Sequence, residues 1–453
     1  MASVFHRGDT DMTRGSIPRL LIVFAIPLLI GNVFQQLYNT VDSIVVGNYV
    51  SKQALAAVGC TSPIINLLIG LFIGLSSGAG VVISQHYGAK DERQLFRAVQ
   101  TSISLTLCLC AVLTAAGVTL TPYLLRLMDT PEDVFVEAVE YLRLYFWGVS
   151  GVLLYNMGAG ILRAVGDSTR PLYFLIFSAV LNTVLDVLFV KYFSMGIAGA
   201  AIATVISQCS SAALVLLLLS RARTAYRVDF TRLQLHPATL RRICGIGIPS
   251  ALQLGITSFS NIFVQSYVNR FASSCMAGWA AYNKIDSFAM LPMMSLSIAI
   301  TTFVGQNLGA GYRTRSRAAL KYGIAMGLTM MVVILTPLML FAPQLTGLFN
   351  QEAEVIRYGS WFIRVISPFY LTFAINQVYM GALRGAGNTR AAMFIALGSF
   401  VVFRQIYLFV TYRLIGGLLV VTLGYPAGWM LCTVLLMLYY RSDKNPLAHR
   451  ADA

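Results

Sequence analysis

Apolar residues fill long stretches of this chain, and polar residues gather in the short segments between them. A helix needs about 20 mainly apolar residues to cross the hydrocarbon core of a bilayer. Stretches of this kind lie near residues 20–49, 53–87, 95–125, 141–162, 171–194, 196–220, 244–269, 276–308, 322–345, 358–383, 391–411 and 415–440. The pattern predicts an all-α membrane protein with twelve transmembrane helices.

The composition and the placement of charge support this class. Hydrophobic residues make up 57% of the 453 residues and charged residues only 11%, too few for a soluble chain. The net charge of +15 does not indicate nucleic-acid binding, because the basic residues lie mostly in short loops. The N-terminus, the even-numbered loops and the C-terminus hold 23 of the 33 lysines and arginines, and the odd-numbered loops hold 7. The positive-inside rule therefore predicts cytoplasmic termini, and we expect a bacterial inner membrane.

The chain contains an internal repeat. "SQHYGAKDERQLFRA" from residue 84 resembles "GQNLGAGYRTRSRAA" from 305, and "GILRAVGDSTRP" from 160 resembles "GALRGAGNTRAA" from 381, both with an offset of 221. Pro27 and Pro249 match with an offset of 222. Because each copy holds six helices, the copies share an orientation and form two lobes related by pseudo-twofold symmetry. We expect an N-terminal lobe at 1–220, a cytoplasmic linker at 221–243 and a C-terminal lobe at 244–453.

Four oxygen-bearing side chains fall at similar depth in the outer half of the first lobe. With a rise of about 1.5 Å per residue, Asp42 lies about 33 Å along the first helix, and Asn182 and Asp186 lie about 17 and 23 Å along the fifth. Thr204 lies about 12 Å from the outer end of the sixth helix. These groups suit a small hard cation such as Na⁺, and two carboxylates that repel each other can also hold a proton. The pattern predicts a cation-binding site, with no other metal and no cofactor.

The first helix, "PLLIGNVFQQLYNTVDSIVVG", resembles that of the MATE (multidrug and toxic compound extrusion) family, which belongs to the MOP flippase superfamily. "SQHYGAKD", "LRAVGDSTRP" and "LRGAGNTR" are similar to loop signatures of the same family. The resemblance implies two six-helix lobes around a cavity and drug efflux driven by inward Na⁺ or H⁺. It also implies that Asp42, Asn182, Asp186 and Thr204 form the cation site. The seventh and tenth helices lack the acids of some relatives, which argues against a second site there.

Other polar residues inside the spans have less specific roles. Side chains of the first and seventh helices are candidates for the substrate cavity: Gln35, Tyr38, Asn39, Asn261 and Gln265. Charged residues within the second lobe are candidates for structural or gating roles: Lys284, Asp286, Arg364 and Arg404. Residues two apart on a helix do not face each other. We therefore expect Asp286 to pair with Arg364 rather than with Lys284, and no partner for Arg404 is evident.

Taken together, these features predict an antiporter that exports amphipathic or cationic, drug-like compounds, with Na⁺ or H⁺ as the coupling ion. A lipid-linked oligosaccharide flippase is an alternative, although it would favour several cavity arginines. A receptor or scaffold without transport activity is a third possibility, which does not explain the repeat or the paired acids. No nucleophile–base set or metal motif indicates an enzyme. We expect a monomer whose partners are the bilayer and small molecules.

Overall fold

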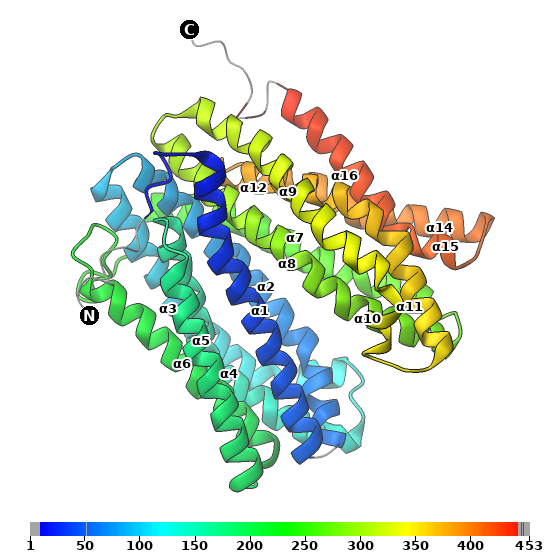
Figure 1. Cartoon of the computed structure of the whole chain (residues 1–453). Helices are drawn as coiled ribbons and strands as arrows, with labels where there is room; N and C mark the ends of the chain where they lie inside the picture. The colour runs from blue at the N-terminus through cyan, green and yellow to red at the C-terminus, as the bar shows by residue number, and fades with distance from the viewer. Residues whose placement is uncertain (1–9, 51, 443–444, 446, 448–453) are drawn as a thin grey trace. The chain divides into compact units, whose positions relative to one another are not determined.

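The structure, a computed structural model, describes residues 10–50, 52–442, 445 and 447, and only the backbone at 39, 41–49, 52, 53 and 55. All regular secondary structure in this part of the chain is helical (Figure 1). The contacts divide the described chain into two compact units, which we consider separately. Unit 1 contains Thr10, Asp11 and Pro27–Ile248, and unit 2 contains Met12–Ile26 and the described residues from Pro249 onward.

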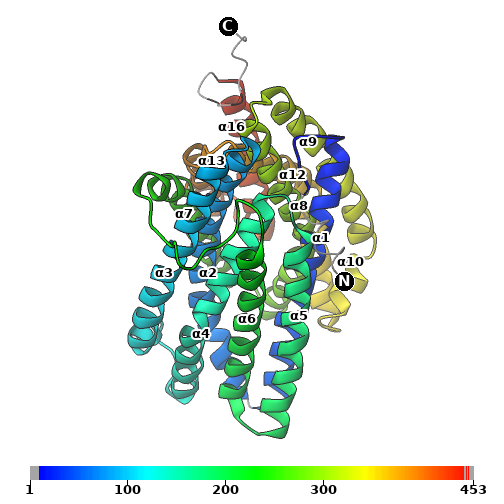
Figure 2. The same ribbon diagram turned by 90° about the vertical axis from the view of Figure 1, so that its left-hand side faces the viewer.

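Unit 1 is organised around one central helix. Its elements are α1 (Ile17–Tyr49, from Pro27 onward), α2 (Lys52–Gly88), α3 (Glu92–Leu127), α4 (Glu132–Ala164), α5 (Thr169–Asp186), the π-helical η1 (Val187–Tyr192) and α6 (Gly196–Arg221). The central α4 packs against α2, α3 and α6, and α5 packs along α6 (Figure 2). A linker then leads to α7 (Pro237–Val268), whose first part, up to Ile248, also belongs to this unit.

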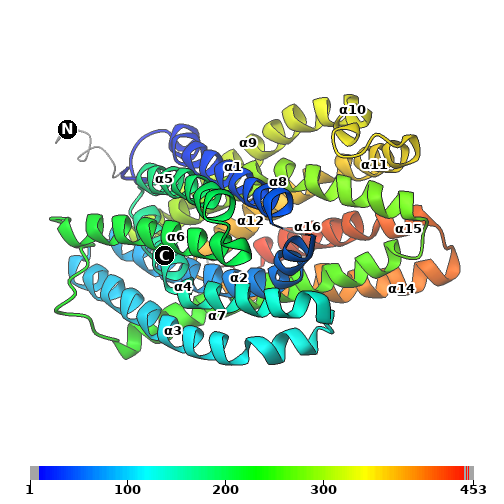
Figure 3. The ribbon, with the colours of Figure 1, turned by 90° about the horizontal axis from the view of Figure 1, so that it is seen from below.

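Unit 2 repeats this plan with more helix breaks. After α7 come α8 (Ser273–Gly309), α9 (Arg313–Leu340), α10 (Ala342–Gly347), α11 (Ala353–Ile366), η2 (Ser367–Phe369), α12 (Tyr370–Gly385), α13 (Thr389–Leu397), η3 (Gly398–Phe403), α14 (Arg404–Leu414), α15 (Leu418–Thr422) and α16 (Gly424–Arg441). Here α12 packs against α8, α9 and α16, and α14, α15 and α16 lie side by side (Figure 3). Pro368 lies in η2, because a proline cannot continue the α-helical hydrogen bonds.

The repeat is visible in atomic detail. Ser76 on α2 donates a hydrogen bond to the carbonyl oxygen of Asn156 on α4 at 3.1 Å. At positions 221 residues later, Ser297 on α8 donates to the carbonyl oxygen of Gln377 on α12 at 2.7 Å. A Cβ atom at Gly381 would lie 2.7 Å from the carbonyl oxygen of Ser297, so only glycine allows the two helices to approach this closely.

Each of the twelve expected spans corresponds to a helix or to a run of adjoining helices. Ten of them, among the described residues, have the length and hydropathy of a membrane-crossing helix. The other two expected spans are α4 and the broken α11–α12 run. Large apolar side chains are exposed on the helix surfaces, for example Val333 at 66% and Phe394 at 68%, as expected where helices face lipid tails. The prediction of twelve transmembrane helices is therefore confirmed.

Candidate functional site

The predicted cation site of unit 1 lies where three helices approach one another. Asn182 and Asp186 are one turn apart on α5, Thr204 is on α6, and their exposed fractions are 1%, 0% and 7%. The Nδ2 amide of Asn182 donates to Oγ1 of Thr204 at 3.4 Å. The hydroxyl of Tyr38, on α1, donates to the same oxygen at 3.4 Å. The structure thus joins α1, α5 and α6 at the hydroxyl of Thr204.

Asp42 follows Tyr38 by four residues in the same helix. The side chains of Asp42 and of the cavity candidate Asn39 lie outside the described residues. The participation of Asp42 in the site therefore stays a prediction.

The site is the end of a buried polar row on α5 that the sequence analysis did not identify in full. Ser178, Asn182 and Asp186 follow one another at intervals of four residues, so they share one helix face, and all three are buried. The hydroxyl of Ser178 donates to the carbonyl oxygen of Ser207 on α6 at 2.9 Å. The four-residue spacing alone could have extended the prediction from Asn182 and Asp186 to Ser178.

The chemistry of this junction suits a cation that carries little water. The Oδ1 atom of Asn182 is buried and accepts no hydrogen bond from any described residue. An amide oxygen left in this way is costly unless another group approaches it. Beside it, the carboxyl group of Asp186 is fully buried. Immediately after Asp186 the backbone changes to the π-helical η1, a local widening that is frequent at functional sites.

Two of the cavity candidates on α7 make hydrogen bonds within unit 2. Gln265 accepts a hydrogen bond from Nε1 of Trp279 at 3.0 Å and donates one to Asn269 at 2.7 Å. Asn261 accepts one from Arg404 at 2.9 Å. On α1, the side chain of Gln35 is exposed. Contact of these residues with substrate remains a prediction.

The expected ion pair between Asp286 and Arg364 is wrong. Asp286 on α8 accepts hydrogen bonds from the hydroxyl of Tyr282, one turn earlier, at 3.4 Å, and from the hydroxyl of Tyr370. The two hydroxyls also lie 3.1 Å apart. The side chains of Arg364 and Lys284 are exposed instead. The prediction used only the depth of each residue along its helix and not the direction of its side chain. Asp286 faces the start of α12, whereas Arg364 points out from the end of α11.

Arg404, for which the sequence offered no partner, is held by three groups. Its side chain is 3% exposed. Its Nη2 atom donates to Oγ of Ser260 at 2.7 Å and to Oδ1 of Asn261 at 2.9 Å. Its guanidinium carbon lies 4.7 Å from the ring centre of Tyr425, a cation–π contact. These partners lie about 20 or 140 positions away in the chain, where residue spacing gives no signal.

Comparison with known proteins identifies similar chains over nearly the full length. The profile of the MatE family matches residues 27–188 and 249–410. The chain is 31% identical over 440 residues to "Probable multidrug resistance protein YoeA" of Bacillus subtilis (strain 168), covering 95% of this chain and 94% of the relative. It is 26% identical to the "FAD transporter" of Shewanella oneidensis, covering 84% and 85%.

Among solved structures, the fold is similar to that of a multidrug resistance MATE family transporter of the MOP superfamily in an outward-facing conformation. The TM-score is 0.89 at 24% identity, with 95% of this chain and 96% of the other covered. At this identity the similarity establishes the fold alone. The profile matches the chain twice, with starts at residues 27 and 249, as the internal repeat predicts.

Proposed function

The chain belongs to the MATE (multidrug and toxic compound extrusion) family of membrane transporters, and from this premise we propose that it exports amphipathic or cationic, drug-like compounds in exchange for Na⁺ or H⁺. The similarity to YoeA over 95% of the chain supports the class of substrate. One observation supports the exchange of a cation above all others: the fully buried carboxyl group of Asp186 beside the unsatisfied amide oxygen of Asn182. An acid buried in a membrane helix is costly, so its presence there favours a functional role for Asp186.

A cation or a proton that occupies the site neutralises one negative charge of the Asp186 and Asp42 pair and so weakens the repulsion between the two carboxyl groups. The bond from Tyr38 to Thr204 connects the site directly to α1. Pro27 lies inside α1 at the point where the helix passes from unit 2 to unit 1. Because proline removes an interior hydrogen bond, α1 can bend there at low cost. Neutralisation therefore changes the packing of α1, and cargo is released to the outside.

We place the protein in the bacterial inner membrane with both termini in the cytoplasm, and we expect it to act as a monomer. The distribution of Lys and Arg among the loops supports this orientation. Labelling of single cysteines, placed in the 221–243 linker and in an odd-numbered loop of intact cells, tests the orientation.

The decisive experiment measures export of a cationic dye from proteoliposomes under an imposed Na⁺ gradient or an imposed pH gradient. We expect one gradient to drive export, and Asp42→Asn and Asp186→Asn each to reduce it to the rate of empty liposomes. Asp286→Asn is the matched control, because it neutralises an acid of unit 2 that lies outside the predicted cation site and binds two tyrosine hydroxyls. Gradient-driven export that persists in the Asp42→Asn and Asp186→Asn proteins would refute the proposal.

Export of a larger, anionic compound is a second candidate, favoured by the 26% identity to the FAD transporter. The same proteoliposomes, loaded with FAD in place of the dye, distinguish the two. We expect faster movement of the cationic dye.

A further inference from the structure

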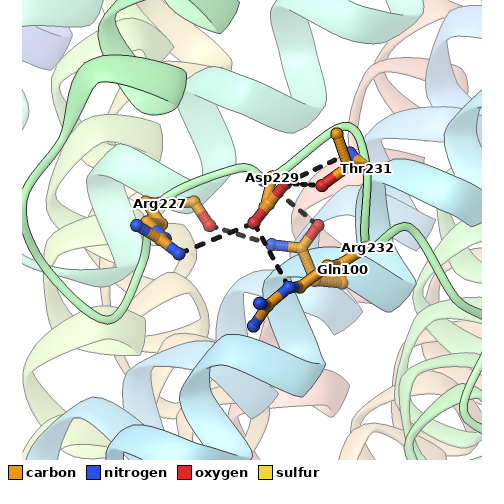
Figure 4. Close-up of polar contacts among 5 residues, drawn as sticks. All are labelled: Gln100, Arg227, Asp229, Thr231 and Arg232. Atoms are coloured by element: carbon orange, nitrogen blue, oxygen red, sulfur yellow. Dashed lines mark hydrogen bonds and ion pairs between the residues drawn. The ribbon is translucent and has the colours of Figure 1, made fainter.

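The linker between α6 and α7 is fixed to α3 by hydrogen bonds. The side-chain amide of Gln100 on α3 donates to the carbonyl oxygen of Arg227 at 2.9 Å and accepts from the N–H of Asp229 at 3.4 Å (Figure 4). Near the end of the linker, Thr101 accepts from the N–H of His236 at 3.3 Å. Gln100 and Thr101 are buried. The linker is therefore an ordered wall beside the first turns of α3.

Asp229 stabilises the turn within this wall. Its Oδ1 accepts hydrogen bonds from the hydroxyl and the N–H of Thr231, at 2.6 and 3.1 Å (Figure 4). Its Oδ2 lies 3.5 Å from Arg227 and 3.8 Å from Arg232. The hydrogen bonds from Thr231, with smaller contributions from the two arginines, lower the pKa of Asp229. The carboxylate is thus charged at neutral pH and attracts the guanidinium group of Arg232, three residues later in the linker.

A cavity of about 600 Å³, broadly open to the outside, lies between this wall and the first two turns of α3. Arg93 and Arg97 line it from α3, and Arg232 and His236 line it from the linker. Arg93 and Arg97 are four residues apart and so share one face of α3. Glu92 contributes the one acidic side chain of the lining. Three arginines against one glutamate give the cavity a net positive charge.

The arginines that line the cavity have guanidinium N–H groups that can still donate hydrogen bonds to a ligand. Among the described residues, no side chain makes a hydrogen bond or ion pair with the guanidinium group of Arg93 or Arg97. Arg232 is 72% exposed and its contact with Asp229 is long, at 3.8 Å. A guanidinium group matches the geometry of a phosphate with two parallel hydrogen bonds.

We propose that this cavity, the linker pocket, binds a phosphate-bearing anion, with the headgroup of an anionic phospholipid as its principal source. Arg93 and Arg97 lie in the first two turns of α3, at one end of a helix long and apolar enough to cross a membrane, which is the end that headgroup phosphates can approach. Phe96 lies between them in the sequence and also lines the cavity, which provides an apolar contact for the first carbons of an acyl chain. Basic pockets beside membrane helices recognise phospholipid headgroups in this way.

The test compares lipid binding by two variants that each remove two positive charges. Arg93→Gln/Arg97→Gln changes the pocket, and Arg221→Gln/Arg223→Gln changes two exposed arginines at the end of α6 and the start of the linker that do not line it. Native mass spectrometry, with phosphatidylglycerol titrated against phosphatidylcholine, measures the affinity of each protein. We expect the pocket variant to bind phosphatidylglycerol about 30-fold more weakly than the wild type, since each of the two basic contacts contributes about 1 kcal/mol. The control variant should differ from the wild type by less than about threefold.

Melting temperatures in phosphatidylcholine alone establish that both variants fold like the wild type. Equal losses of affinity in the two variants would show only general attraction to negative charge and would overturn the proposal. A wild type that does not prefer phosphatidylglycerol, and binds neither inorganic phosphate nor ADP, would also overturn it. Inorganic phosphate or ADP could also displace phosphatidylglycerol from the wild type but not act on the pocket variant. That result would support the pocket, with a soluble phosphate compound as its occupant. The readout is binding, so the result is independent of the transport proposal.

Discussion

In unit 1 the hydroxyl of Thr204 accepts hydrogen bonds from Asn182 on α5 and Tyr38 on α1, at 3.4 Å each. At the repeat offset of 222, Tyr38 of unit 1 corresponds to Ser260 of unit 2, and Asn182 corresponds to Arg404. At the offset of 221, Thr204 corresponds to Tyr425. In unit 2 these three residues are again in contact, with Arg404 2.7 Å from Ser260 and 4.7 Å from the ring of Tyr425. The same junction of three helices therefore occurs twice with different charges.

The acids of unit 1 have apolar counterparts in unit 2. The offset of 222 takes Asp42 to Val264 and Asp186 to Leu408, and both of these apolar side chains have no exposed surface. Unit 2 thus carries a permanent cation, Arg404, where unit 1 carries acids and an unsatisfied amide oxygen. A guanidinium group does not lose its proton in a protein. The cation exchange proposed above therefore falls to unit 1, whereas unit 2 holds the guanidinium group of Arg404 in place.

The strongest test of this comparison gives unit 1 the residues of unit 2. The double variant Asn182→Arg/Asp186→Leu reproduces the Arg404 and Leu408 pair of unit 2. We expect it to fold but to lose ion-driven export entirely, because a fixed guanidinium replaces the mobile cation. Export from proteoliposomes and melting temperature are the measurements. Asn182→Leu/Asp186→Leu should lose export as well, because it lacks Asp186, so its melting temperature shows what the added charge alone does to folding. Ion-driven export in the Arg/Leu protein would break the comparison.

Arg404→Gln tests the opposite side of the comparison. Hydrogen bonds to charged groups contribute about 1.5–3 kcal/mol each, and this change removes or weakens two of them. We expect the free energy of unfolding to fall by about 3 kcal/mol, while the choice of coupling ion stays the same. Arg413→Gln, an exposed arginine on the same α14, should change stability by less than about 0.5 kcal/mol. A changed ion preference in Arg404→Gln, with normal stability, would show that unit 2 takes part in ion exchange.

A smaller effect is expected from Thr204→Val, which removes the shared acceptor but keeps the shape of the side chain. The lost hydrogen bonds are long, so we expect a cost of about 1 kcal/mol and about fivefold weaker dependence of export on the coupling ion. Thr183→Val is the control, since the hydroxyl of Thr183 bonds within α5 to the carbonyl oxygen of Ala179 at 3.0 Å. The rate of export, measured as the concentration of the coupling ion is raised, should depend differently on that concentration in Thr204→Val and in Thr183→Val. Matching curves would mean that the hydroxyl of Thr204 does not contribute to the cation site.

The helices and part of the site follow from local features of the sequence. Apolar length predicts the spans, and the four-residue spacing of Asn182 and Asp186 places them on one face of α5. Tyr282 could have been found in the same way, because it lies four residues before Asp286. Tyr370 could not, because its contact with Asp286 depends on the break at η2, which orients the start of α12.

The partners of Arg404 also lie beyond sequence spacing. Ser260 and Asn261 are on a different helix about 140 positions earlier, and their contact depends on how α7 and α14 pack. The internal repeat carries the missing information, since Ser260 corresponds to Tyr38 and Arg404 to Asn182. Correspondence between repeats is informative here because tertiary packing is repeated even where residue chemistry is not.

The smallest predicted effect concerns the linker, which only unit 1 carries among the described residues. The pKa of Asp229 is lowered in the folded protein, chiefly by the hydrogen bonds from Thr231. Its contribution to stability is therefore full above the unfolded pKa of about 3.9 and is lost as the pH falls through the lower, folded value. We expect Asp229→Asn to melt slightly below the wild type at pH 7 and at the same temperature in strong acid. Thermal unfolding across this pH range measures the difference, and Asp133→Asn, an exposed acid in the first turn of α4, is the control. Equal melting temperatures of Asp229→Asn and the wild type at pH 7 would mean that the turn is held by the backbone alone and does not depend on the charge of Asp229.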